Sequence, residues 1–140
     1  MAIELTDEWK QALNSAFVDG CPILWSSTGS DGQSALNFFG STQTYSDHQL
    51  GIWMRTPDRG FLQRISENPK VSMMYRNPVT RLVIQIHGEA RRADDQETKD
   101  RVYNAAPEAE QKADAEKAGT AVIVEITRVV QRGQVVQSRD

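Results

Sequence analysis

The stretch TAVIVEITRVV, residues 120–130, constrains the fold more than any other part of the chain. It is apolar on both faces for most of its length, and it is rich in β-branched residues, which favour strands. A strand with two apolar faces has to be covered on both of them. We therefore expect residues 120–130 to form a central strand of a closed or covered sheet.

Shorter β-prone segments, separated by turn-forming residues, make up much of the remaining chain. Residues 81–92, RLVIQIHGEARR, alternate so that Leu82, Ile84, Ile86 and Ala90 face one side of a sheet. The other predicted strands cover residues 22–28, 34–45, 49–54 and 70–75. Because strands and helices do not alternate regularly, the pattern predicts a mainly β fold, an antiparallel β-barrel with peripheral helices.

Helical periodicity marks four further segments. In residues 6–20, Thr6 can cap a helix on which Trp9, Leu13 and Phe17 share one face. The other predicted helices cover residues 61–68, 94–106 and 107–119. The last of these is nearly all alanine and charged residues, so we expect it to lie on the surface.

Composition excludes several classes of function. A net charge of −3 argues against a general nucleic-acid or membrane partner, and no apolar run approaches the roughly 20 residues of a membrane span. With one cysteine, Cys21, and two histidines, His48 and His87, we expect neither an internal disulfide nor a metal site. The acidic start of the chain lacks the apolar stretch of a secretory signal. We expect a single cytoplasmic domain over residues 1–140.

Residues 52–71, IWMRTPDRGFLQRISENPKV, place two arginines and a threonine between a strand and a short helix. An arginine fork can bind two oxygens of a phosphate, a threonine hydroxyl adds a donor, and the first N–H groups of a helix favour anions. Arg55, Thr56 and Arg59 are therefore candidate phosphate ligands. The alternative is that the arginines are surface cations that balance nearby acidic residues.

The order of these segments resembles a known family. A helix, a hairpin, the stretch LGIWMRTPDRGFLQRISENPKVSMMYRNP and a strand ending in IHGEARRADD, with a final helix and strand, are similar to the FMN-binding split-barrel family of pyridoxamine 5′-phosphate oxidase-like proteins. The resemblance implies a six- to seven-stranded antiparallel split barrel. It also implies a homodimer with flavin sites at the subunit interface, and a phosphate near the turn RTPDRG. One feature departs from the family: Phe61 and Gly60 stand eight and nine residues before Pro69, where relatives tend to carry a basic pair.

The resemblance also implies which further residues meet the cofactor. It places FFGSTQ alongside the flavin ring, makes the aromatic residues candidates to stack on or wall the ring, and lets the RNPVT turn reach the partner's site. These candidates are Phe39, Gly40, Ser41, Gln43, Trp53, Phe61 and Arg81. The alternatives are an edge strand and a turn that face water, and aromatic rings that belong to the core, which we expect for Phe39 or Trp53 at least.

Two hypotheses of function follow. In a flavin enzyme the cofactor supplies the redox chemistry, so no catalytic residue is assigned. The first hypothesis is a small FMN-dependent oxidoreductase that acts on a small molecule between two subunits. The second is a non-catalytic, stress-related protein of the same fold that binds a flavin, an F420-type deazaflavin or haem, or has lost its cofactor; Phe61 in place of a lysine favours it. A carrier of apolar ligands is a more distant alternative.

Overall fold

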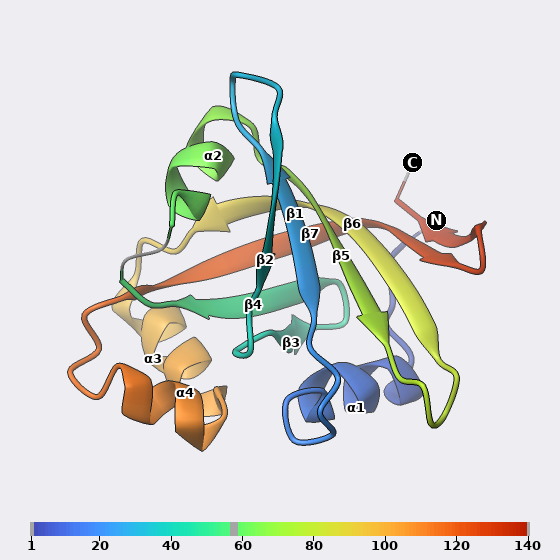
Figure 1. Ribbon diagram of the computed structural model, residues 1–140, viewed down its shortest axis with the longest axis horizontal. Helices are drawn as coiled ribbons and strands as arrows, with labels where there is room; N and C mark the ends of the chain where they lie inside the picture. The colour runs from blue at the N-terminus through green and yellow to red at the C-terminus, as the bar shows by residue number, and fades with distance from the viewer. Residues whose placement is uncertain (1, 57–58, 140) are drawn as a thin grey trace.

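The computed structural model describes residues 2–56 and 59–139, which contain eight strands and four helices (Figure 1). The strands are β1 (Leu24–Thr28), β2 (Ser34–Phe38), β3 (Gln43–Ser46), β4 (Gln49–Met54), β5 (Lys70–Arg76), β6 (Val83–Arg92), β7 (Thr120–Gln131) and β8 (Gln134–Ser138). The helices are α1 (Asp7–Ser15), α2 (Phe61–Glu67), α3 (Gln96–Ala105) and α4 (Glu108–Ala113). Pro57 and Asp58, in the predicted phosphate turn, lie outside the described residues.

All the paired strands are antiparallel and belong to one sheet with the order β2-β1-β5-β6-β7-β4-β3, and β8 pairs with β7 off this path. Within the described part of the chain, β2 and β3 are the two ends of this order and do not pair with each other. The sheet is therefore open between β2 and β3. This confirms the predicted antiparallel split barrel with peripheral helices, although the structure has eight strands instead of six or seven.

The additional strand has a local cause. Arg132 and Gly133, between β7 and β8, have φ angles of 51° and 77°, and Gln131 pairs directly with Gln134. Two central residues with positive φ are the signature of a tight two-residue hairpin turn. The chain therefore turns back on β7 and adds β8, which the sequence analysis had not identified.

The strand predicted over residues 34–45 is broken into β2 and β3. These two strands lie at opposite ends of the sheet order, so the residues between them carry the chain across the open side of the barrel (Figure 1). Ser41 fixes this crossing to β4, because its Oγ accepts a hydrogen bond from the Trp53 N–H and donates one to the Trp53 carbonyl, both at 2.9 Å. A continuous strand was the wrong prediction here.

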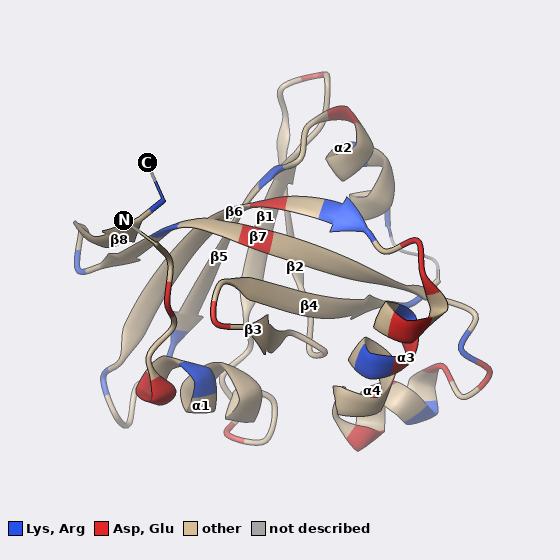
Figure 2. Ribbon diagram, turned by 180° about the vertical axis from the view of Figure 1, so that it is seen from behind, with Lys and Arg blue, Asp and Glu red and all other residues tan. Residues whose placement is uncertain are grey.

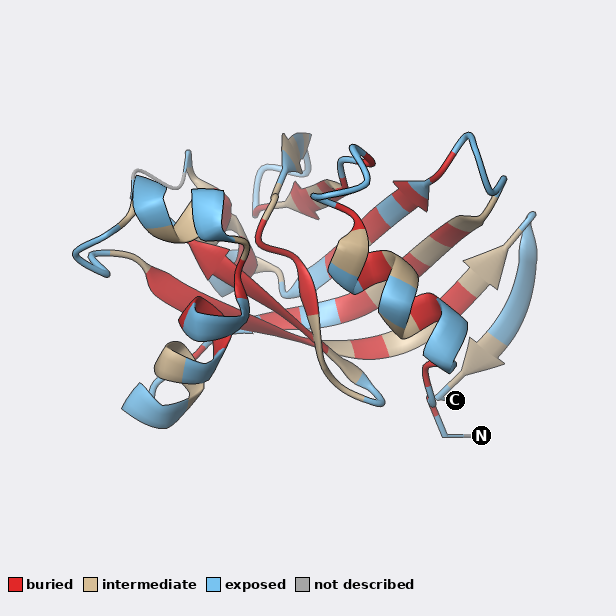
Figure 3. Ribbon diagram, turned by 90° about the horizontal axis from the view of Figure 1, so that it is seen from below, coloured by how far each residue is buried: buried red, intermediate tan, exposed pale blue. Residues whose placement is uncertain are grey.

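β7 is buried on both faces, as its sequence predicts. One face contributes Val122 and Val124 to the main core inside the barrel. The opposite face contributes Ala121 and Ile123 to a second apolar cluster that includes Val102 of α3. Figure 3 shows that the buried stretches follow the strands and the inner faces of the helices. The central position of β7 follows directly from its two apolar faces.

α1 begins as predicted, with the Thr6 side chain accepting a hydrogen bond from the Trp9 N–H. Trp9 and Leu13 are buried, but Phe17 is 45% exposed. The predicted position of Phe17 on the inner face was wrong because the helix ends at Ser15, before it. No helix in the described ranges is long and apolar enough to cross a membrane.

Candidate functional site

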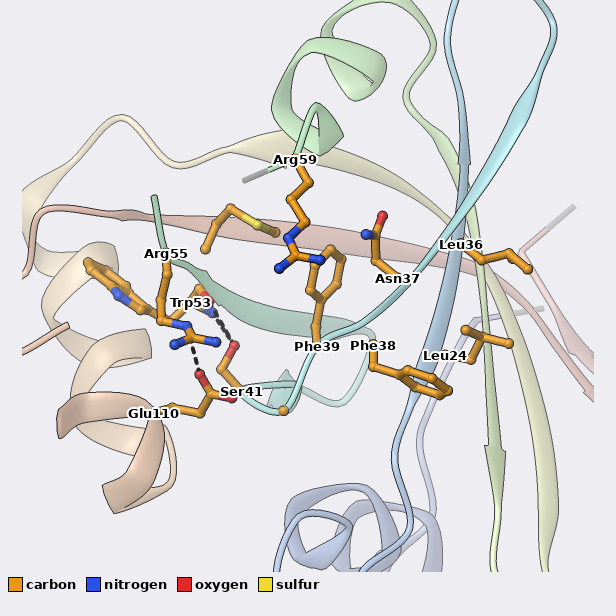
Figure 4. Close-up of a pocket in the computed structure, with 12 residues that line it drawn as sticks. Leu24, Leu36, Asn37, Phe38, Phe39, Ser41, Trp53, Arg55, Arg59 and Glu110 are labelled. Carbon is orange, nitrogen blue, oxygen red and sulfur yellow. Dashed lines mark hydrogen bonds and ion pairs between the residues drawn. The ribbon is translucent and has the colours of Figure 1, made fainter. Parts of the chain in front are cut away.

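A hollow of about 650 Å³ lies where the chain crosses the open side of the barrel (Figure 4). Its walls come from Leu24 of β1, the edge strand β2 and the crossing that follows it, the end of β4, the turn before α2, and α4. The lining residues are Leu24, Leu36, Asn37, Phe38, Phe39, Gly40, Ser41, Trp53, Met54, Arg55, Arg59 and Glu110. Its volume is in the range of sites for small molecules and cofactors.

Arg55 stands at the end of β4 and is paired with an acidic residue of α4. Its Nε lies 3.2 Å from Oε2 of Glu110. The side chain of Glu110 is 13% exposed, while that of Arg55 is 50% exposed. Figure 4 shows this pair at one side of the hollow, next to Ser41. The guanidinium therefore reaches the hollow with a carboxylate already bound to it.

Arg59 lies in the turn just before α2 and extends toward Phe39 in Figure 4. It and the following Gly60 both have positive φ, 57° and 89°. A Cβ at position 60 would be strained at this φ, and it would lie 2.9 Å from Nη1 of Arg64. The next residue, Phe61, is fully buried and packs edge-on against Phe39, with ring centroids 4.9 Å apart. The two positions at which the sequence departs from the split-barrel family thus hold a glycine in a turn, Gly60, and an aromatic ring in the core, Phe61.

Arg64 of α2 organises the wall on this side. It donates hydrogen bonds from Nε to Ser27 Oγ at 2.7 Å and from Nη2 to Asn37 Oδ1 at 3.1 Å. Its Nη1 also donates to the carbonyl of Arg59 at 3.3 Å. One guanidinium therefore joins β1, β2 and the turn before α2. Since the Asn37 oxygen accepts from Arg64, the amide nitrogen is turned toward the hollow (Figure 4).

The opposite wall depends on Asp114, which follows α4. Its carboxylate accepts hydrogen bonds from Trp53 Nε1 and from the backbone N–H groups of Ala118 and Gly119, each at 2.9 Å. Burial by itself would raise the pKa of Asp114. The hydrogen bonds from Trp53 and the two backbone groups, together with the positive charge of Arg55, outweigh burial and lower this pKa below its ordinary value. Asp114 is therefore held in its charged form against β4.

The structure brings six of the ten predicted cofactor contacts together in the hollow: Phe39, Gly40, Ser41, Trp53, Arg55 and Arg59. The other four do not line it. They are Gln43, whose buried amide donates to the carbonyls of Ser41 and Val102; Thr56, which is exposed; Phe61, which lies in the core; and Arg81, which lies in the turn between β5 and β6.

The sequence analysis missed half of the lining residues: Leu24, Leu36, Asn37, Phe38, Met54 and Glu110. Four of these six, Leu36, Asn37, Phe38 and Met54, lie in predicted strands that already carried candidates, so the neighbouring candidates were the available signal. Leu24 lies in a predicted strand that carried none. Glu110 had no such signal. It belongs to a helix of alanine and charged residues whose acidic groups look alike in sequence, and only the tertiary structure selects one of them.

A second hollow, of about 480 Å³, lies over β1, β5, β6 and β7 and is mostly polar. It contains His87, Arg128 and Lys70 with several hydroxyl groups. Burial, together with the positive charge of Arg128, lowers the pKa of His87. With cations and hydroxyl groups and a less apolar lining, this hollow is a weaker candidate for a large organic ligand than the first one.

The first hollow combines two guanidinium groups at one end with apolar and aromatic side chains along the rest. The residues that line it carry no further ionised group apart from Glu110, within the described ranges. Figure 2 shows positive and negative residues interspersed over the rest of the molecule. The arrangement suits a ligand with a flat apolar body and an anionic end.

No family model matches the chain, and no curated protein matches it. Solved structures do match. An FMN-binding protein from Syntrophomonas wolfei subsp. wolfei has a TM-score of 0.65 at 11% identity, over 95% of this chain and 89% of that one. A protein of the pyridoxinephosphate oxidase family from Clostridium acetobutylicum, related to general stress protein 26 of B. subtilis, has a TM-score of 0.65 at 10% identity, over 94% and 96%.

HutZ, the haem storage protein from Vibrio cholerae, is similar with a TM-score of 0.66 at 11% identity, over 88% of this chain and 89% of that one. A protein named F420 reductase also matches, with a TM-score of 0.65 at 15% identity, over 90% and 98%. Identities this low show the fold alone. The chain has the pyridoxamine 5′-phosphate oxidase-like split-barrel fold, whose members among these structures differ in the ligand they are named for.

Proposed function

We propose that this protein binds FMN in the hollow between β2, β4 and α4 and acts as a small flavin-dependent oxidoreductase on a small molecule. The single observation that carries the proposal is the hollow itself, where Arg55 and Arg59 stand together beside the apolar side chains of β2. A ligand that joins a phosphate group to a flat aromatic ring fits a hollow with guanidinium groups in one part and apolar side chains in the other. The proposed cytoplasmic location comes from the sequence alone.

The lining residues fit such a cofactor. Arg55 and Arg59 would hold the phosphate, while Phe39, Leu24 and Met54 would pack against the ring. When bound, FMN supplies hydride or electron transfer, and the chain's own residues bind and orient it and exclude water from one side. Trp53 and Ser41 support this side of the hollow, since the hydrogen bonds between them fix the crossing to β4.

We further propose that two copies of the chain meet over this hollow. Leu36 and Phe38 on the edge strand β2 are 64% and 65% exposed, and both line the hollow. Leu24 and Met74 continue this apolar surface, because Leu24 pairs with Phe38 on one side and with Met74 on the other. Apolar surface of this kind is typical of an interaction site. A second copy would cover the open wall and complete a site between subunits.

The second candidate function is binding of a flavin, an F420-type deazaflavin or haem without turnover. The observation that favours it is the pairing of Arg55 with Glu110, together with the absence of a side chain at Gly60 and the burial of Phe61. These features leave fewer cations for a phosphate. For haem, no described residue that lines the hollow is a histidine or cysteine, so the iron would need an axial ligand from elsewhere.

The visible spectrum of purified protein, before and after addition of FMN and gel filtration, tests the proposal. We expect FMN to elute with the protein, and Arg55→Ala and Arg59→Ala each to weaken its binding by about tenfold or more. Arg139→Ala is the matched control, because Arg139 is similarly exposed at 49% and also pairs with a glutamate, Glu89, at 3.5 Å. This variant should bind FMN like the parent.

Failure of the parent to retain FMN would overturn the flavin assignment, and equal binding by all three variants would overturn the phosphate assignment. The same titration with F420 and with haemin separates the candidate ligands. Oxidation of bound reduced FMN by candidate small molecules separates an enzyme from a carrier. Sedimentation tests the shared site, since a stable monomer at micromolar concentration contradicts it.

A further inference from the structure

We propose that Glu110 determines ligand specificity in this hollow, by competing with the anionic end of the ligand for Arg55. A ligand gains the full charge of Arg55 only when it displaces the Glu110 carboxylate. The same ligand without its anionic group binds with the pair intact. The inference rests on the proposed function, since it assumes that the ligand is a flavin with a phosphate.

The position of Glu110 differs from that of its neighbour on the same helix. Glu108 is 78% exposed and forms a helix-surface pair with Lys112, whereas the Glu110 side chain is 13% exposed. Its Oε2 lies 3.2 Å from the Arg55 Nε, at the edge of the hollow. A carboxylate that is mostly removed from water and has one cationic partner lowers the positive potential that Arg55 presents to a ligand.

The backbone around Glu110 leaves room for this carboxylate. A Cβ at Gly40 would lie 2.5 Å from Glu110 Oε1 and 3.0 Å from the Phe17 ring. Any side chain at position 40 would therefore displace the carboxylate or the ring. Gly40 belongs to the crossing that lines the hollow, so the same residue shapes the ligand site and accepts the carboxylate.

The rest of α4 does not depend on Glu110. The Gln111 side-chain amide donates hydrogen bonds to the carbonyls of Tyr103, Asn104 and Ala106, at 3.0 to 3.2 Å. Asp114 binds Trp53, and the Tyr103 hydroxyl donates to the Gln111 carbonyl at 3.0 Å. The helix therefore stays on β4 when the Glu110 side chain moves. Displacement by a ligand requires a side-chain rotation and no unfolding of the helix.

Glu110→Gln tests the inference because it keeps the size of the side chain and removes its charge. FMN and riboflavin share the ring and ribityl chain and differ in the phosphate, and both can be titrated by quenching of flavin fluorescence. We expect Glu110→Gln to tighten FMN binding by about tenfold and to leave riboflavin binding unchanged. Glu108→Gln, on the same helix, should change neither affinity.

Adding Arg55→Ala to Glu110→Gln should abolish the tightening of FMN binding, because the guanidinium that Glu110→Gln frees for the phosphate is then no longer present. If the parent binds FMN and Glu110→Gln has the same ratio of FMN to riboflavin affinity, this inference is overturned and the proposed function stands. If neither the parent nor Glu110→Gln binds FMN, both are overturned. Equal tightening of FMN and riboflavin would also overturn the competition, because charge would then play no part.

Discussion

The two helices that border the hollow, α2 and α4, are held to the barrel by opposite kinds of interaction. α2 buries Phe61 and Ile65 in the main core. α4 buries no residue and is attached through polar groups, chiefly Gln111 on the preceding helix and the adjoining Asp114 on Trp53 of β4, with Glu110 on Arg55 beside them. One wall of the site is therefore placed by apolar packing, and the other by pairing of charged and polar side chains.

This difference has consequences for function. Apolar burial is strong and does not respond to the charge of a ligand, so α2 should give a fixed wall. An ion pair such as that of Arg55 and Glu110, in which one partner is half-exposed, is weak compared with apolar burial, and it responds to other charges nearby. α4 therefore supplies the wall that a charged ligand can influence. The proposed role of Glu110 follows from its position on this second wall.

Removal of the apolar anchor of α2 should have the largest effect. Phe61→Ala removes a fully buried ring that packs on Phe39, so we expect the free energy of unfolding to fall by about 3 to 5 kcal/mol. Urea denaturation followed by far-ultraviolet circular dichroism measures this change. Leu62→Ala, at a partly buried position of the same helix, should lower the free energy of unfolding clearly less than Phe61→Ala does. A loss below about 1 kcal/mol for Phe61→Ala would show that α2 is not anchored by burial.

A smaller effect is expected from the contact between α4 and β4. Trp53→Phe keeps an aromatic ring next to Tyr103 and removes the indole N–H that donates to Asp114 at 2.9 Å. We expect the free energy of unfolding to fall by about 1 to 3 kcal/mol, because the charged Asp114 carboxylate loses one of its hydrogen-bond donors. Hydrogen exchange should show faster opening of α4 than of α2 in this variant. Equal acceleration in both helices would contradict the separate attachment of the two walls.

The same difference explains what the sequence could predict. Segments whose burial follows from periodicity were predicted close to their observed bounds: residues 61–68 for α2, 81–92 for β6 and 120–130 for β7. The spacing of their apolar residues predicts which face of the helix or strand is buried, without knowledge of the residues that it contacts. The fold class follows from such segments, because most of the sheet consists of them.

The parts that the sequence could not predict depend on polar contacts between distant residues. Ser41 divides the strand predicted over 34–45 by bonding to Trp53, and Arg64 joins Asn37 to α2. Residues 107–119 were expected only to lie on the surface, and nothing in their local pattern distinguishes Glu110 from Glu108. Such contacts are set by the tertiary structure, so a single sequence carries no periodic signal for them.

The pH dependence of stability should reveal the attachment of α4, with the smallest effect of the three. The pKa of Asp114 is lowered in the folded protein, so its contribution to stability is complete above its ordinary pKa and is lost as the pH falls through the folded value. The stability difference between the parent and Asp114→Asn should therefore shrink from about pH 7 to about pH 3. The net effect is small, because burial opposes the hydrogen bonds.

Asp47, Glu67 and Asp95 also have lowered pKa values, but they are present in both proteins and cancel in the difference. A difference that stays constant or grows as the pH falls would show that Asp114 does not hold α4 as a charged group.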